Sequence, residues 1–227
     1  TAALCLALVA WVPMSTWWMA AGLGVALGAA CMGLGNLVPL HREGWRSDGR
    51  GLLDLARRTP DAALQLQINQ LMALSLADVR PRDWPATSIP VVDAGVASDG
   101  LQLTARLLRL SHASDCRDAD AAREEAEALA AAFPKAPAVF QPAIAVTLAS
   151  HAALLVGDRT LLAAWRARCE GGLMDLSPYR AWIDAELAAL DGDADALAAH
   201  LHQAYALADR LPDAASRRVF EERPTVL

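Results

Sequence analysis

The residues of this chain best suited to chemistry follow a long apolar run, where Asn36 and Pro39 precede the pair Asp48-Gly49. Polar or ionisable groups at a membrane boundary are costly unless they have partners, so residues of this kind are candidates for a functional site. Pro39 has no amide hydrogen and clashes with the preceding turn, which should end a helix and free backbone carbonyls near Asn36. Gly49 would give the backbone room to turn beside the Asp48 carboxylate.

The same residues also allow a purely structural interpretation. Asn36 and Pro39 are ordinary residues for a helix end, and Asp48-Gly49 would then be a surface turn from which a helix starts at Gly51. Spacing alone leaves both interpretations open.

The order Asn36-Leu-Val-Pro39, then Asp48-Gly49, then Leu52-Leu53 resembles the C-terminal motif of the site-2 protease family of intramembrane zinc metalloproteases. The resemblance covers about residues 17–58 and implies that Asp48 is the third zinc ligand, with Asn36 and Pro39 beside the substrate strand. In that family two histidines of an H-E-x-x-H helix complete the metal site, and its glutamate is the general base.

Two features depart from the usual family pattern: eight residues separate Pro39 from Asp48, and Ser47 stands where an apolar residue usually precedes the aspartate. The Ser-Asp-Gly form with its leucine pair nevertheless resembles a bacterial subgroup that carries a soluble helical extension.

A site with two histidines and one aspartate leaves one position of tetrahedral zinc for water, which the metal acidifies and a neighbouring glutamate deprotonates for attack on a peptide carbonyl. The chain has five histidines, none followed directly by Glu, so it contains no H-E-x-x-H. Its first residue, Thr1, falls within an apolar run. We therefore expect the C-terminal fragment of a longer zinc protease, inactive alone. The alternative is a non-catalytic, membrane-anchored tetratricopeptide-like scaffold that binds proteins.

The elements that would position these residues begin with a membrane part. Residues 1–40 contain no Lys, Arg, Asp or Glu, and the segment 17–40 is long enough to span a bilayer. A shorter apolar stretch, 1–12, precedes a turn over 12–18 whose tryptophans favour the membrane interface. Five arginines within 41–58 predict that this end is cytoplasmic. Together with this topology, the resemblance to the site-2 proteases implies a bacterial inner-membrane protein that cuts a membrane-embedded protein substrate.

Helical patterns continue from residue 59 to the end. Thr59-Pro-Asp61 should start a helix that ends near Asp78, and the prolines between 80 and 98 indicate a hinge-like connector. Further helices are expected over about 99–113, 118–133, 138–156, 159–170, 177–190, 193–210 and from 212. The Gly-Asp breaks at 157 and 192 lie 35 residues apart, near the period of about 34 of tetratricopeptide repeats.

These patterns predict an all-α fold in which transmembrane helices precede a soluble tetratricopeptide-like domain. The expected divisions are a membrane part at 1–58, a helix and proline-rich connector at 59–98, and a cytoplasmic helical domain at 99–227 that has a possible protein partner. From residue 59 on, 23 acidic residues outnumber 15 basic ones, which argues against nucleic-acid binding. Four widely separated cysteines without a C-x-x-C pair indicate a reducing compartment and no structural zinc site.

Several other side chains carry weaker expectations. His200 and His202 should face different sides of a helix, so a metal site there is not expected. Trp165 and Trp182 are expected in the core. Solvated positions are expected for Asp54 and for the acidic run Glu124, Glu125 and Glu127.

Overall fold

The structure is a computed structural model that describes residues 15–42, 45–92 and 99–222. In this part of the chain the fold is helical apart from one two-residue strand pair, which confirms the all-α class. The chain divides into two compact units, Thr1–Ala62 (unit 1) and Ala63–Leu227 (unit 2).

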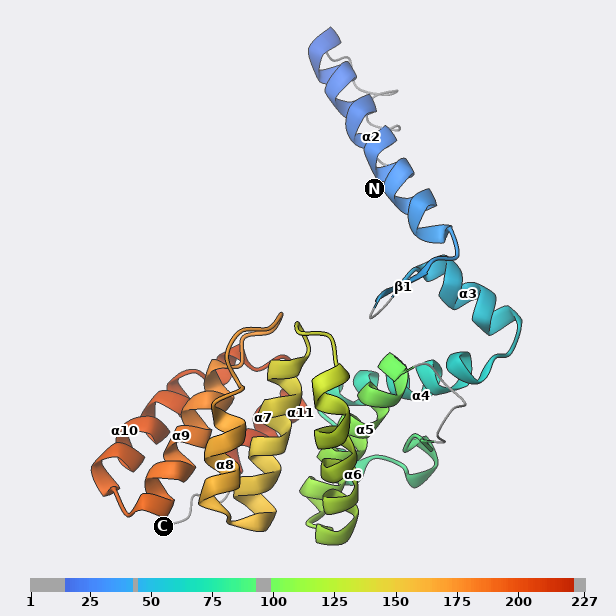
Figure 1. The fold of residues 1–227 in the computed structure, drawn as a ribbon. Coiled ribbons are helices and arrows are strands. Elements are labelled where there is room, and N and C mark those ends of the chain that lie inside the picture. The colour runs from blue at the N-terminus through green and yellow to red at the C-terminus, as the bar shows by residue number, and fades with distance from the viewer. Residues whose placement is uncertain (1–14, 43–44, 93–98, 223–227) are drawn as a thin grey trace. The chain divides into compact units, whose positions relative to one another are not determined.

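Unit 1 contains the apolar helix α2, Thr16–Leu37, drawn in blue in Figure 1. With 22 residues it is long and apolar enough to cross a membrane, and no other helix of the described residues is. Its side chains are mostly exposed, including Trp17 and Trp18 at its start. The expected apolar segment 1–12 and residues 12–14 of the expected turn lie outside the described residues.

Helix α2 ends where the proline predicts. Val38 takes an extended conformation, because the ring of the following Pro39 disfavours helical geometry at the residue before it. The chain then forms the antiparallel pair β1 (His41–Arg42) and β2 (Trp45–Arg46) and enters α3, Asp48–Ala56. The structural interpretation had this helix starting at Gly51, whereas it starts three residues earlier.

Helix α4, Pro60–Leu76, begins as expected from its cap. The Thr59 hydroxyl accepts a hydrogen bond from the Ala62 amide at 3.3 Å, which satisfies one of the free donors of the first turn. The helix crosses the division between the units, and its residues Leu64 and Ile68 pack in unit 2 against Ala105.

The remaining helices of unit 2 match the expected segments closely. They are the short η1 (Pro81–Asp83) and η2 (Ala86–Ser88), then α5 (Asp99–Cys116), α6 (Ala119–Ala132), η3 (Phe133–Lys135), α7 (Gln141–His151) with the π-helical turn η4 (Ala152–Val156), α8 (Arg159–Arg166), α9 (Ser177–Asp191), α10 (Ala194–Ala206), η5 (Ala208–Arg210) and α11 (Ala214–Glu221).

Two of the breaks between these helices have the same geometry. Gly157 and Gly192 both take left-handed backbone angles, with φ of 70° and 73°, which glycine adopts without strain. The next residues, Asp158 and Asp193, each accept hydrogen bonds from amides of the following helix and cap it. This repeated break fits a helix-pair repeat, but the tetratricopeptide-like nature of unit 2 stays a prediction.

Consecutive helices from α5 to α10 lie side by side in the order of the chain (Figure 1). Small residues let them approach closely, and a few large side chains fill the space between them. Trp182 is buried at 2% exposure and Trp165 packs at the edge of the same core, which confirms the expectation for both tryptophans.

The described part of the proline-rich connector packs on α5 instead of forming a free linker. Arg80 Nη2 lies 2.6 Å from Asp115 Oδ1, and both side chains are buried. Arg80 also pairs with Glu222, at the C-terminal end of α11. The Trp84 ring stacks on His112 with centroids 6.3 Å apart. Arg80 and Trp84 are therefore buried in unit 2, whereas Arg82 and Asp83 between them are exposed.

The expectation of a fully solvated acidic face on α6 is wrong for Glu125. Its carboxylate is 3% exposed and lies 3.0 Å from Arg106 Nη1 and 2.5 Å from Arg109 Nε. Because α5 supplies both arginines, Glu125 ties α6 to α5. Glu124 and Glu127 are exposed as expected.

Candidate functional site

The structure brings two of the motif residues into direct contact. Asn36, in the last turn of α2, donates from Nδ2 to Asp48 Oδ2 at 2.5 Å. In return, the backbone amide of Asp48 donates to Asn36 Oδ1 at 3.3 Å. The carboxamide thus holds Asp48 by its side chain and by its backbone, across twelve residues of chain.

Ser47 makes the junction between the two helices rigid. Its hydroxyl donates to the Val38 carbonyl at 2.6 Å and accepts from the amides of Leu40 at 2.9 Å and Arg50 at 3.2 Å. The hydroxyl therefore donates a hydrogen bond to a carbonyl that has no helical partner at the end of α2, and it also caps the N-terminus of α3. Pro39 lies between Val38 and Leu40, two of the residues that bond to the Ser47 hydroxyl. The side-chain hydrogen bond to Asp48 comes from Asn36 and not from Pro39. In the sequence Ser47 stood out only as a departure from the family pattern, although a serine directly before a helix start is a capping signal.

Gly49 is required by the close approach of the two helices. A Cβ at this position would lie 1.7 Å from the Leu37 carbonyl oxygen and 2.2 Å from its carbon. Backbone-to-backbone contact of this kind is possible only without a side chain. In the Asp48-Gly49 pair, Asp48 accepts a hydrogen bond from Asn36, and Gly49 allows the start of α3 to contact the Leu37 backbone at the end of α2.

The carboxylate of Asp48 is exposed, and only its Oδ2 accepts a hydrogen bond from the residues that the structure describes. Its Oδ1 is therefore available to a cation. Asp54, further along α3, differs: it is 1% exposed, and Arg50 Nε lies 3.1 Å from its carboxylate. The expectation of a solvated Asp54 was wrong, because α3 turns this residue inward.

Within the described ranges no three His, Cys, Asp or Glu side chains lie close enough to hold a metal ion together. Asp48 would be a single ligand, and any further ligands would have to come from elsewhere. His200 and His202 lie on α10, where they form no metal site with other described residues.

Comparison with protein-family models, curated proteins and solved structures finds no match for this chain. The resemblance to the site-2 proteases therefore depends on the motif residues and on their arrangement at the end of α2.

Proposed function

We propose that this chain supplies the third metal ligand, Asp48, of an intramembrane zinc metalloprotease of the site-2 type. The observation that carries the proposal is the pair of hydrogen bonds between Asn36 and Asp48 at the end of an apolar helix. A surface turn would not need a carboxamide on the preceding helix to fix its aspartate.

The residues present fit one side of a zinc site. A carboxylate that binds zinc is usually oriented by hydrogen bonds from groups that do not touch the metal, and Asn36 Nδ2 is such a donor. Zinc would supply an acidified water for peptide hydrolysis. Asp48, oriented by Asn36, would hold the metal beside the helix end, and Pro39 would keep the neighbouring segment extended for a substrate strand. The histidine ligands and the general base would come from an H-E-x-x-H segment encoded before this sequence.

The test is to replace Asp48 with Asn in the full-length protein in its native membrane. This change keeps the shape of the side chain but removes the anionic ligand, so bound zinc and cleavage of a membrane-embedded substrate should both be lost. The matched control is Asp83→Asn, since the Asp83 side chain is exposed and its nearest cation, Arg82 Nε, lies 4.0 Å away. Asp54 cannot serve as this control because it is buried. Full zinc occupancy and normal cleavage in Asp48→Asn would contradict the proposal.

The alternative, a membrane-anchored scaffold without catalysis, draws on a different observation. Helices α5 to α10 stack in chain order, as in repeat proteins that bind partners along an extended surface. The coding sequence before Thr1 discriminates between the two functions. An H-E-x-x-H motif within an apolar helix there supports the protease, and its absence leaves the scaffold.

We also propose that the protein lies in a bacterial inner membrane, with unit 2 on the cytoplasmic side. The support is that residues 1–40 contain no charged side chain, whereas residues 41–58 contain five arginines, which favour the cytoplasmic side of a membrane. A reporter fused after Arg58 should be active only in the cytoplasm. Activity on the other side of the membrane would reverse the assignment.

A further inference from the structure

Two loops meet at one end of unit 2. The first covers residues 133–140 between α6 and α7, and the second covers 167–176 between α8 and α9. A Cβ on Gly172 would lie 3.3 Å from the Pro142 Cβ, so the second loop touches the start of α7. The rings of Phe133 and Trp165, at the roots of the two loops, are 5.3 Å apart. We name these two loops the loop pair.

The loop pair exposes large apolar side chains. Leu173 is 75% exposed, Met174 54%, Val139 45% and Phe140 39%. Single exposed apolar residues are normal on a soluble surface, but four on two touching loops form a patch that indicates an interaction site.

The charges around the patch favour an anionic partner. Each acid of the loop pair has a cationic partner: Glu170 pairs with Arg166 and Asp175 with Arg210. Two cations of the loops, Lys135 and Arg168, have no acidic partner among the described residues. Arg168 instead lies over the Trp165 ring, 5.5 Å from its centroid. The two loops by themselves have no net charge, since they contain two cations and two acids. Because Arg166 and Arg210, outside the loops, pair with both acids, Lys135 and Arg168 are left as the cations that an anionic partner could contact.

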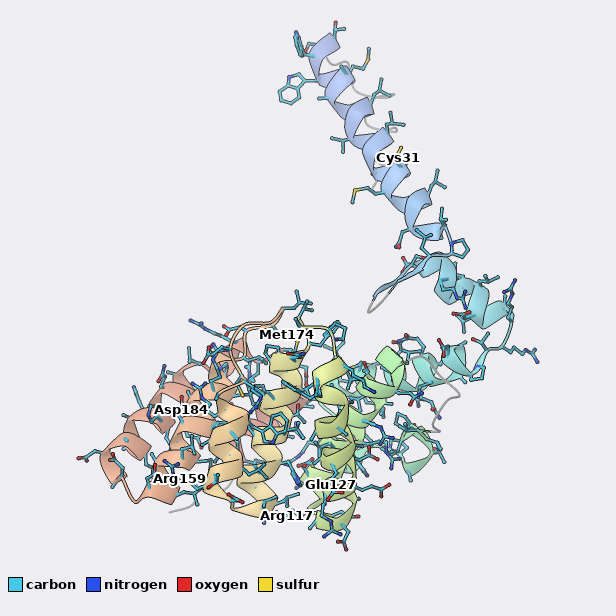
Figure 2. The ribbon with its side chains drawn as sticks, in the orientation of Figure 1. Cys31, Arg117, Glu127, Arg159, Met174 and Asp184 are labelled. Carbon is cyan, nitrogen blue, oxygen red and sulfur yellow. The ribbon has the colours of Figure 1, made fainter. Side chains whose placement is uncertain are left out.

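The opposite end of the helix row differs in the residues that form its turns. In Figure 2 Met174 lies at one end of the row, whereas Arg117 and Arg159 lie at the other. The turns at that other end are dominated by aspartates, three of which cap helices: Asp118, Asp158 and Asp193. That end also exposes the apolar side chains of Val156 and Leu161 and the cation Arg117, so what distinguishes the loop pair is its four large apolar side chains on two touching loops.

We propose that the loop pair docks on the surface of an anionic phospholipid bilayer. Apolar side chains that enter the boundary between headgroups and acyl chains, next to cations that contact lipid phosphates, give this type of membrane binding. The same chain carries α2, which is long and apolar enough to span a membrane. Residues 38–62 between α2 and unit 2 span at most roughly 85 Å, and α3 within them shortens this limit, so an anchored α2 would keep unit 2 within reach of the bilayer.

The test uses hydrogen–deuterium exchange of the full chain reconstituted in vesicles. One set of vesicles contains phosphatidylcholine alone, and the other contains equal parts of phosphatidylcholine and phosphatidylglycerol. Peptides from the loop pair should exchange several-fold more slowly in the anionic vesicles. Peptides from α9, which lies in the core, should exchange equally in both and report the integrity of the fold.

Two double variants separate the apolar and the charged contributions. Leu173→Ser with Met174→Ser, and Lys135→Gln with Arg168→Gln, should each abolish the slower exchange. The matched control is Val156→Ser with Leu161→Ser, which removes exposed apolar side chains at the far end of α7 and the start of α8 and should leave the slower exchange unchanged. If a serine variant also loosened α9, the glutamine variant would decide, because it removes charge without removing apolar contacts of the core.

Three outcomes would overturn the proposal. Unprotected loops in anionic vesicles would show that no docking occurs, and equal protection in both vesicles would show that lipid charge is not recognised. Protection that rises with the number of chains per vesicle would identify a second copy of the chain as the occupant. The proposal is independent of proteolysis, because an Asp48→Asn chain should show the same protection.

Discussion

Replacement of Gly49 by Ala tests whether the close contact between α2 and α3 fixes the candidate site. The added Cβ would lie 1.7 Å from the Leu37 carbonyl oxygen, whereas real Cβ atoms essentially never come closer than 3.0 Å to such an atom. The obstacle is backbone and cannot rotate away. The start of α3 must therefore move by more than an ångström, which breaks the short hydrogen bond between Asn36 and Asp48.

The magnitude follows from three contributions. Overpacking of this kind costs about 2 kcal/mol, and loss of the exposed Asn36–Asp48 hydrogen bond costs about 1 kcal/mol more. Alanine offsets about 1 kcal/mol because it is a better helix former than glycine. A net loss of about 2 kcal/mol corresponds to roughly a thirtyfold change in the equilibrium between the closed and open junction.

The assay is hydrogen–deuterium exchange of the α3 amides in the full chain, in vesicles. Exchange at Gly51, whose amide donates to the Ser47 carbonyl at 3.1 Å, should accelerate about thirtyfold in Gly49→Ala. Gly100→Ala is a closely matched control, because both helices begin with Asp-Gly and a Cβ on Gly100 would meet nothing within 4 Å. In that variant we expect α5 to exchange up to about fivefold more slowly, from helix propensity alone.

The steric explanation would fail if α3 exchanged at the same rate in Gly49→Ala and in the unmodified chain. It would also fail if the two alanine variants shifted exchange of their helices equally and in the same direction, because contact with Leu37 would then play no part. Under the proposed function, Gly49→Ala in the full-length protein should in addition lower zinc occupancy, since Asn36 would no longer hold Asp48.

Three further predictions concern unit 2. Arg80→Met leaves a buried carboxylate without its bidentate partner and should cost about 3–5 kcal/mol in thermal unfolding followed by circular dichroism, whereas Arg82→Met, at an exposed position, should cost under about 1 kcal/mol. Burial lowers the pKa of His151 below its ordinary value, so the imidazole binds a proton at a higher pH in the unfolded chain than in the folded one. The free energy of unfolding should therefore fall as the pH drops from 7 to 5, and melting temperatures should show a smaller fall in His151→Phe. Burial raises the pKa of the Cys169 thiol to about 11, so iodoacetamide at neutral pH should leave it unmodified until the chain is denatured, while the exposed Cys116 reacts slowly in the native state; equal rates would contradict this.

Local signals in the sequence determined the helical segments of unit 2. Asp158 and Asp193 accept hydrogen bonds from amides within three residues of themselves, and Gly157 and Gly192 end the preceding helices by their own backbone angles. Such caps depend on neighbours in the chain, so a pattern in the sequence is enough to find them. The apolar helix α2 was predictable for the same reason, since an uncharged run and a following proline define its extent.

The partners of the charged residues were decided by the tertiary structure alone. Asp54 and Glu125 look like surface acids in the sequence, yet both are buried against arginines, because the facing side of a helix depends on what packs against it. The motif indicated Asp48 as a zinc ligand and Asn36 as a residue beside the substrate strand, but it did not predict the hydrogen bonds between them. Those bonds form because Gly49 lets α3 approach the Leu37 backbone, a contact between segments twelve residues apart that no local rule contains.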